Sequence, residues 1–226
     1  MSAVRLPTGV VLCAAALAIA RPVAAQQPVD GGHLELSAGV VWAGALALGS
    51  AAATETSSSG QPVPIFATST TLGAFAAFEG RVGWRFARSF TAEADASVGK
   101  HDLRIAVSND VEGAPAATVA ERVDQFTIGG ALIWHAPFGS PRVRPFAAAG
   151  GGYLRALHEN ATLVQTGQYY QFGGGADVLL MSRDPARLKN LGVRVDARAL
   201  VRVKGVAFDD AAHTAPAVGA SLFVRF

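Results

Sequence analysis

Apolar and polar residues alternate along most of the chain with a period of two. The clearest run, at about 191–203, places valine and alanine on one side and arginine and aspartate on the other. This period is typical of β-strands, because successive side chains of a strand point to opposite faces. Eight such runs are predicted as strands, at about 34–42, 71–84, 89–103, 122–134, 142–156, 168–181, 191–203 and 214–226.

Each run has one face that is almost entirely apolar, and the other face carries most of the charged residues. For the second run the apolar face is predicted to hold Leu72, Ala74, Ala76, Phe78, Val82 and Trp84. The fifth run is rich in glycine, and its apolar face is assigned to Phe146, Ala148, Gly150, Gly152 and Leu154.

The connections between the runs alternate in length. Long ones are expected at about 43–70, 104–121, 157–167 and 204–213, and shorter ones with turn-forming residues at 85–88, 137–141 and 183–185. Regular short and long alternation is typical of a transmembrane β-barrel, with brief periplasmic turns and longer outer loops.

Two further features favour a membrane barrel over a soluble β-sandwich, whose strands would also alternate. Each run approaches the roughly 9–11 residues of a tilted spanning strand, whereas ordinary strands average about five or six. Aromatic side chains also gather near the ends of the runs, as they do in interfacial girdles. The expected girdle residues are Trp42, Trp84, Phe90, Trp134, Phe146 and Tyr170.

The first 25 residues are predicted to be a secretory signal that is removed. Arg5 precedes an apolar stretch at 10–20, and small residues at 23–25 precede the expected cut before Gln26. A lipid anchor on Cys13 is rejected, because Leu12 stands where a small residue is expected. Residues 26–32 would then form a short lead-in, and 33–226 the barrel domain.

Composition excludes several other classes of protein. The sequence is 50% hydrophobic and 16% charged, which disfavours a disordered chain. Removal of the signal would leave 17 basic and 17 acidic residues, so the charge balance offers no argument for nucleic-acid binding. The single cysteine lies in the signal, which excludes a disulfide framework.

The last strand resembles those of the small outer-membrane β-barrel family, the OmpA-like and OmpX-like barrels of eight strands. Such strands end in a glycine, spaced apolar residues and a terminal aromatic, a signal for the barrel-assembly machinery. Weaker similarities lie at 144–153 and 193–198, and the resemblance as a whole extends over essentially all of 33–226. The matching residues of the assembly signal are Gly219, Leu222, Val224 and Phe226.

The resemblance and the alternation together predict an all-β, eight-stranded antiparallel up-and-down barrel. Eight strands enclose an interior that side chains can fill, and charges in it must pair. Closure would bring Arg225 close to Glu35. The expected ionic network in the lumen consists of Glu35, Glu79, Arg81, Glu93, Asp95, Asp177, Arg194, Asp196, Arg198, Arg202 and Arg225.

No catalytic or metal-binding constellation is found in the sequence. The five histidines form no HxH or HExxH spacing, and no cofactor is expected. A lipid A-modifying enzyme on this fold would need a histidine beside a serine or threonine at the lipid-facing rim. Loop 43–70 is interpreted as a disordered surface loop or as a recognition element.

The predicted protein is a monomer of the bacterial outer membrane, exported across the inner membrane. Its expected partners are membrane lipid, the assembly machinery and a surface partner contacted through loop 43–70. The predicted role is structural, in envelope integrity, or interactive. The alternatives are a narrow porin-like channel, a lipid A-modifying barrel enzyme and a soluble periplasmic barrel with an apolar ligand. The soluble barrel would need the two faces of its strands inverted, with these residues inside: Val193, Val195, Val201, Leu222 and Val224.

Overall fold

A computed structural model describes residues 33–112, 115–140, 142–158, 164–182, 190–203 and 212–226. The predicted signal at 1–25, the lead-in at 26–32 and the turn at 183–185 lie outside these ranges. Within them the chain forms ten strands: β1 Leu34–Ala43, β2 Leu46–Thr56, β3 Pro62–Leu72, β4 Phe75–Ala87, β5 Phe90–Ser108, β6 Ala117–His135, β7 Val143–His158, β8 Val164–Ser182, β9 Asn190–Val203 and β10 His213–Arg225. No helix in the described part of the chain is long and apolar enough to cross a membrane.

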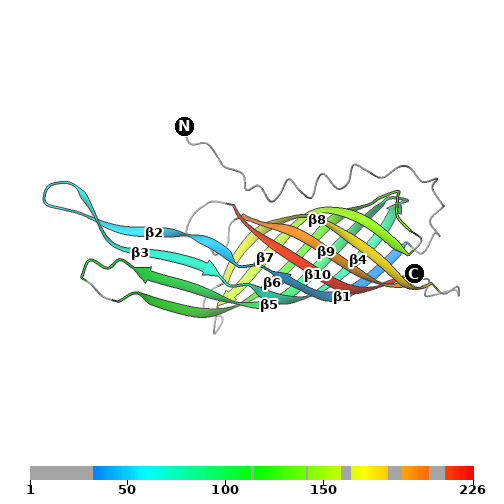
Figure 1. The fold of residues 1–226 in the computed structure, drawn as a ribbon, viewed down its shortest axis with the longest axis horizontal. Helices are drawn as coiled ribbons and strands as arrows, with labels where there is room; N and C mark the ends of the chain where they lie inside the picture. The colour runs from blue at the N-terminus through cyan, green and yellow to red at the C-terminus, as the bar shows by residue number, and fades with distance from the viewer. Residues whose placement is uncertain (1–32, 113–114, 141, 159–163, 183–189, 204–211) are drawn as a thin grey trace.

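Eight of the strands close into an antiparallel barrel, as predicted (Figure 1). The ring runs β1-β4-β5-β6-β7-β8-β9-β10 and returns to β1. Closure pairs Glu35 with Arg225 and continues to Ala43 opposite Ala217. Because the ring is closed, the backbone groups of its strands find partners in neighbouring strands, which is what a β-structure in lipid requires.

Strands β2 and β3 form a hairpin that continues beyond one end of the barrel (Figure 1). β3 pairs with the outer part of β5, from Leu72 opposite Leu103 to Ala67 opposite Ser108. β5 and β6 remain paired as far as Val107 opposite Ala117. The long-connection end of the molecule therefore carries a four-stranded extension in the order β2-β3-β5-β6.

This extension corrects the predictions for loops 43–70 and 104–121. Residues 46–56 and 62–72 are strands, not a disordered loop, and much of 104–121 continues β5 and β6. Leu72 belongs to β3, and its side chain is buried, not exposed on an outer face. The extended segments were missed because their alternation is weak, with alanine, serine and threonine on both faces.

The apolar face of the fifth predicted run is also corrected. In β7 the side chains of Phe146 and Leu154 point into the barrel and are buried, while Tyr153 is exposed. The prediction for Phe146 as a girdle residue is therefore wrong. Alanine and glycine at 147–152 offer almost no contrast in polarity. The sequence therefore could not show which face of this strand points into the barrel.

The faces of the remaining barrel strands are those predicted from the alternation. Glu35, Arg81 and Arg194 point inward and are buried, whereas Val195 and Leu222 are exposed on the outside. A soluble barrel with an apolar interior would need the last two residues inside. The arrangement of faces excludes that inverted alternative.

Glycines on the inner face permit close approach of neighbouring strands. A Cβ atom added to Gly175 of β8 would lie 2.0 Å from the carbonyl oxygen of Val195, whereas one added to Gly80 would meet nothing within 4 Å. We expect Gly175→Ala to lower the free energy of unfolding by about 1–3 kcal/mol or more, because the backbone of β9 has to move. Gly80→Ala is the matched control and should be nearly neutral.

The two glycine variants are compared by urea titration of the folded protein in lipid vesicles, with tryptophan fluorescence as the signal. Equal free energies of unfolding for the two variants would show that the close contact between β8 and β9 at Gly175 does not limit the stability of the barrel.

Candidate functional site

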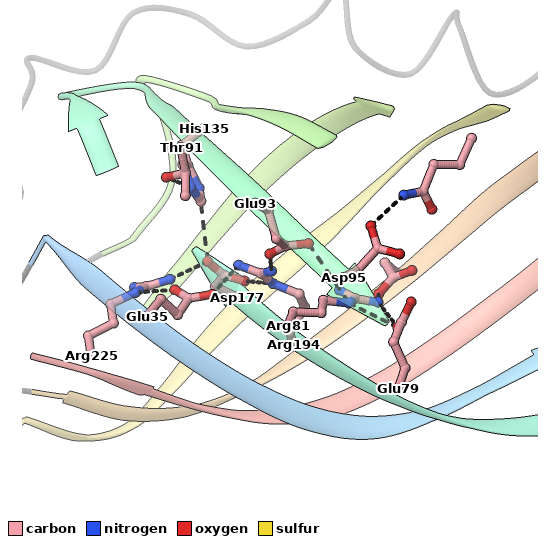
Figure 2. A network of polar contacts seen from close by, with 12 residues as sticks. Glu35, Glu79, Arg81, Thr91, Glu93, Asp95, His135, Asp177, Arg194 and Arg225 are labelled. Atoms are coloured by element: carbon pink, nitrogen blue, oxygen red, sulfur yellow. Dashed lines mark hydrogen bonds and ion pairs between the residues drawn. The ribbon is translucent and has the colours of Figure 1, made fainter. Parts of the chain in front are cut away.

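The charged inner side chains gather in the half of the barrel nearer the short turns. They come from β1, β4, β5, β8, β9 and β10, where alternate residues of each strand face inward. Most are almost completely buried. Figure 2 shows most of them inside the ring of strands, with their hydrogen bonds and ion pairs as dashed lines.

Arg194 is at the centre of this group, and its side chain has no exposed surface. Its Nε donates to Asp177 over 2.8 Å, its Nη1 to Glu93 over 2.6 Å and its Nη2 to Glu35 over 2.6 Å. The guanidinium carbon also lies 5.0 Å from the centre of the Phe146 ring. One arginine thus joins carboxylates from three other strands across the lumen.

Arg225 links the last strand to the first, as the sequence predicted. Its Nε donates to Glu35 over 2.6 Å, and its Nη2 donates to Asp177. The guanidinium carbon lies 4.3 Å from the ring centre of Phe223, which is fully buried. Glu35 and Asp177 therefore each bind both arginines, and the four side chains form a closed ionic cycle (Figure 2).

A second group lies farther along the barrel toward the extension. Arg198 donates to Glu79 over 2.8 and 2.9 Å and also binds Asp196. Arg81 binds Glu79 and donates to Asp196 over 3.2 Å. A 3.8 Å contact between Arg81 and Glu93 joins this group to the first.

Asp95 belongs to the network through hydrogen bonds and has no ion pair with another described residue. Its two oxygens accept from the Tyr169 hydroxyl over 2.9 Å and from the Gln171 amide over 3.3 Å. Gln171 in turn accepts from Arg198 over 2.9 Å. The carboxylate is thereby connected to an arginine through one intervening amide.

Arg202 is the exception among the eleven residues predicted for the network. It lies on β9 four residues beyond Arg198, toward the extension, and forms no ion pair with any described residue. Its Nη1 atom is buried and has no hydrogen-bond partner. The prediction placed it in the network because it shares the inward face of Arg194 and Arg198, but distance along the strand separates it from the acids.

The sequence analysis did not identify His135 and Thr91, which extend the network toward the short turns (Figure 2). The Nε2 of His135 lies 3.3 Å from the Thr91 hydroxyl, and its Nδ1 lies 3.9 Å from Asp177. A hydroxyl, an imidazole and a carboxylate in this order could in principle activate a nucleophile. Here all three are buried in the lumen, and both Asp177 oxygens are occupied by arginines.

Between the charged network and the extension, the inward-facing side chains are mostly apolar. Inward residues near the extension form two apolar clusters. One comprises Leu46, Leu48, Leu72, Leu103, Val123, Ala156 and Ala215. The other comprises Val41, Ala43, Ala77 and Ala217, with Phe75 and Leu200 packed against it. The sequence signal that could have found this layer is the presence of adjacent apolar residues, as at Val40 and Val41, where both faces of a strand are apolar.

The outer face carries the predicted aromatic residues apart from Phe146. Trp42, Trp84, Phe90, Trp134 and Tyr170 are all exposed. In the proposed assembly signal, Leu222 and Phe226 are exposed on the outside and Val224 is half-buried. Gly219 faces inward, where an added Cβ would lie 3.1 Å from a carboxylate oxygen of Asp196.

Comparison with solved structures identifies the type of barrel. The crystal structure of Neisserial surface protein A (NspA) matches with a TM-score of 0.54 at 12% identity, covering 87% of this chain and 99% of that one. The fold is that of a small outer-membrane β-barrel. The outer membrane protein OprG from Pseudomonas aeruginosa matches with a TM-score of 0.47 at 11% identity, covering 87% and 97% of the two chains. No family model and no curated protein matches the sequence.

The charged residues of the lumen form a network in which arginines are paired with carboxylates. Its arginines are shared between two or three carboxylates, and the rings of Phe146 and Phe223 lie against two of them. Among the described residues, no three histidine, cysteine, aspartate or glutamate side chains are grouped to hold a metal ion. The network joins side chains from six of the barrel strands across the lumen.

Proposed function

We propose that the protein is an outer-membrane anchor with a sealed lumen that presents the β2-β3-β5-β6 extension at the cell surface. The role is structural or adhesive and requires no enzymatic chemistry. The observation that carries the proposal is the ionic network centred on Arg194, which connects strands on opposite sides of the lumen.

The outer surface supports insertion into lipid. Large apolar side chains are exposed around the barrel, among them Phe78 at 73%, Ile128 at 65% and Leu222 at 59%. A soluble monomer rarely exposes so continuous an apolar surface. A β-barrel in a bilayer needs paired backbone groups and an apolar exterior, and its interior can be polar. This barrel has all three properties, and the charges of its interior neutralise one another.

The shape of the extension supports a role at the surface. Membrane barrels carry their longer connections on the extracellular side, and here two of these connections are paired into one sheet. Among the described strands, β2 pairs with β3 alone and forms the edge of this sheet, which is where a partner strand can be added. We therefore assign the predicted surface contact of loop 43–70 to this sheet.

The proposal is tested by reconstituting the protein into planar lipid bilayers after folding has been verified by heat-modifiable migration on a gel. We expect no discrete conductance steps under an applied voltage, because the paired charges and the apolar clusters obstruct the lumen at two levels. A porin reconstituted in the same bilayers is the positive control. Regular single-channel steps from the folded protein would contradict the proposal and favour the narrow channel.

A further inference from the structure

A cavity of about 70 Å³ lies in the lumen between the charged network and the apolar clusters. Glu79, Asp95 and Arg198 border it on the network side. Its walls toward the extension are apolar and include Leu72, Phe75 and Leu200. Neither the charged network nor the proposed anchoring role requires this space.

Two polar side chains on the border of the cavity, one buried and one half-buried, each have a buried atom without a hydrogen-bond partner. Gln125 is 7% exposed, and its Oε1 atom has no hydrogen-bond partner. Arg202 also lines the cavity, and its Nη1 atom is buried and equally unpartnered. Unsatisfied buried polar atoms are costly, and a cation without a counter-charge is more costly still. Their position at one cavity indicates a ligand or ordered water there.

The size of the cavity limits the ligand. A water molecule needs roughly 10–15 Å³ by this measure, so the space holds about five to seven waters. In liquid that number of waters takes up roughly 150–200 Å³. A compact organic molecule of about eight to ten non-hydrogen atoms fits such a space.

The charges near the cavity determine which end of a ligand is bound. Both acids on its border are already engaged: Glu79 binds Arg81 and Arg198, and Asp95 accepts from Tyr169 and Gln171. The guanidinium of Arg202 is the charged group that lacks a counter-ion among the described residues. An anionic head therefore gains more here than a cationic one.

We propose that this cavity binds a small carboxylate with an aromatic or short aliphatic body. The carboxylate accepts hydrogen bonds from Arg202, and the body packs against Leu72, Phe75 and Leu200. The amide of Gln125 provides a second polar contact. The bound molecule supplies Arg202 with the counter-charge that none of the described residues provides.

The test is ligand-observed NMR on the full-length protein folded in detergent micelles, with benzoate, benzyl alcohol and benzylamine as probes. We expect saturable binding of benzoate and weaker binding of the other two. Arg202→Gln should lower the affinity for benzoate about tenfold or more, because a charge-assisted pair is lost. The affinity for benzyl alcohol should stay nearly unchanged. Arg104→Gln, at an exposed arginine of β5, is the matched charge control and should bind as the unmodified protein does.

A second pair of variants separates binding in the cavity from partition into the micelle. Ala215→Phe fills the cavity from β10 and should abolish binding, whereas Ala220→Phe adds the same ring to the exposed face of that strand and should not. If Ala215→Phe does not show heat-modifiable migration, Leu200→Phe replaces it. The proposal is overturned if benzylamine binds more tightly than benzoate. It is also overturned if benzoate binding is unchanged by Arg202→Gln or by the cavity-filling variant. These outcomes are independent of the conductance test.

Discussion

Replacing Arg194 with methionine is expected to lower the free energy of unfolding by about 3–5 kcal/mol, the range observed when one partner of a buried ion pair is removed. Arg194 donates to Glu35, Glu93 and Asp177. Without it, the one ion pair left to Glu93 among the described residues is the 3.8 Å contact with Arg81. Methionine retains much of the volume, so the loss is mainly electrostatic.

The effect of Arg194→Met is measured by urea titration in lipid vesicles, with Arg104→Met as the control at an exposed arginine. The control should change stability by less than about 0.5 kcal/mol. Arg194→Lys should fall between the two, because a single ammonium cannot reach three carboxylates in fixed directions. Equal stability of Arg194→Met and its control would mean that the network seals the lumen without stabilising the barrel.

Placing an arginine on the outer face of the barrel is expected to be almost as damaging. Val195 of β9 is 46% exposed and lies between Ala176 and Ala220 of the neighbouring strands. If lipid covers this face, Val195→Arg should cost about 2–4 kcal/mol, as for arginine near the middle of a bilayer. Because the residues opposite Val195 on both neighbouring strands are alanines, the desolvated guanidinium would have no carboxylate beside it to pair with.

The control for this second prediction is Val119→Arg. Val119 is 63% exposed and lies on β6 in the extension, opposite Ile105. If the extension is in water, this substitution should stay within about 0.5 kcal/mol of the unmodified protein. Similar small costs at Val119 and Val195 would indicate that the barrel is not embedded in lipid, and would contradict the proposed location.

The fold could be predicted from sequence because the two faces of most strands differ strongly in polarity. A shift of one residue in β9 would carry Arg194, Asp196 and Arg198 to the outside, so its orientation is strongly specified. The same argument holds for β4 around Glu79 and Arg81. Where this contrast is lost, at 146–152 in β7 and in the extension, the prediction of face or of strand failed.

The composition of the charged network could also be predicted from sequence, because inward position follows from parity along each strand. The sequence could not predict which acid binds which base. Arg194 and Glu35 are 159 positions apart and meet only because barrel closure brings β9 and β1 within reach across the lumen. Arg202 shows the opposite case, since it has the right parity but lies too far along β9 to reach the acids.

The sequence by itself therefore determined the strand period, the number of spanning strands and the side on which charges lie. The first two follow from local alternation, and the last follows once the strand lengths and aromatic girdles favour a membrane barrel. Only the tertiary structure decided the pairing of charges, the inward turn of Phe146 beneath Arg194, the sheet built from β2, β3, β5 and β6, and the cavity beside Arg202. Each of these depends on the register between strands that are distant in sequence, which is set when the barrel closes and not by the pattern within any one strand.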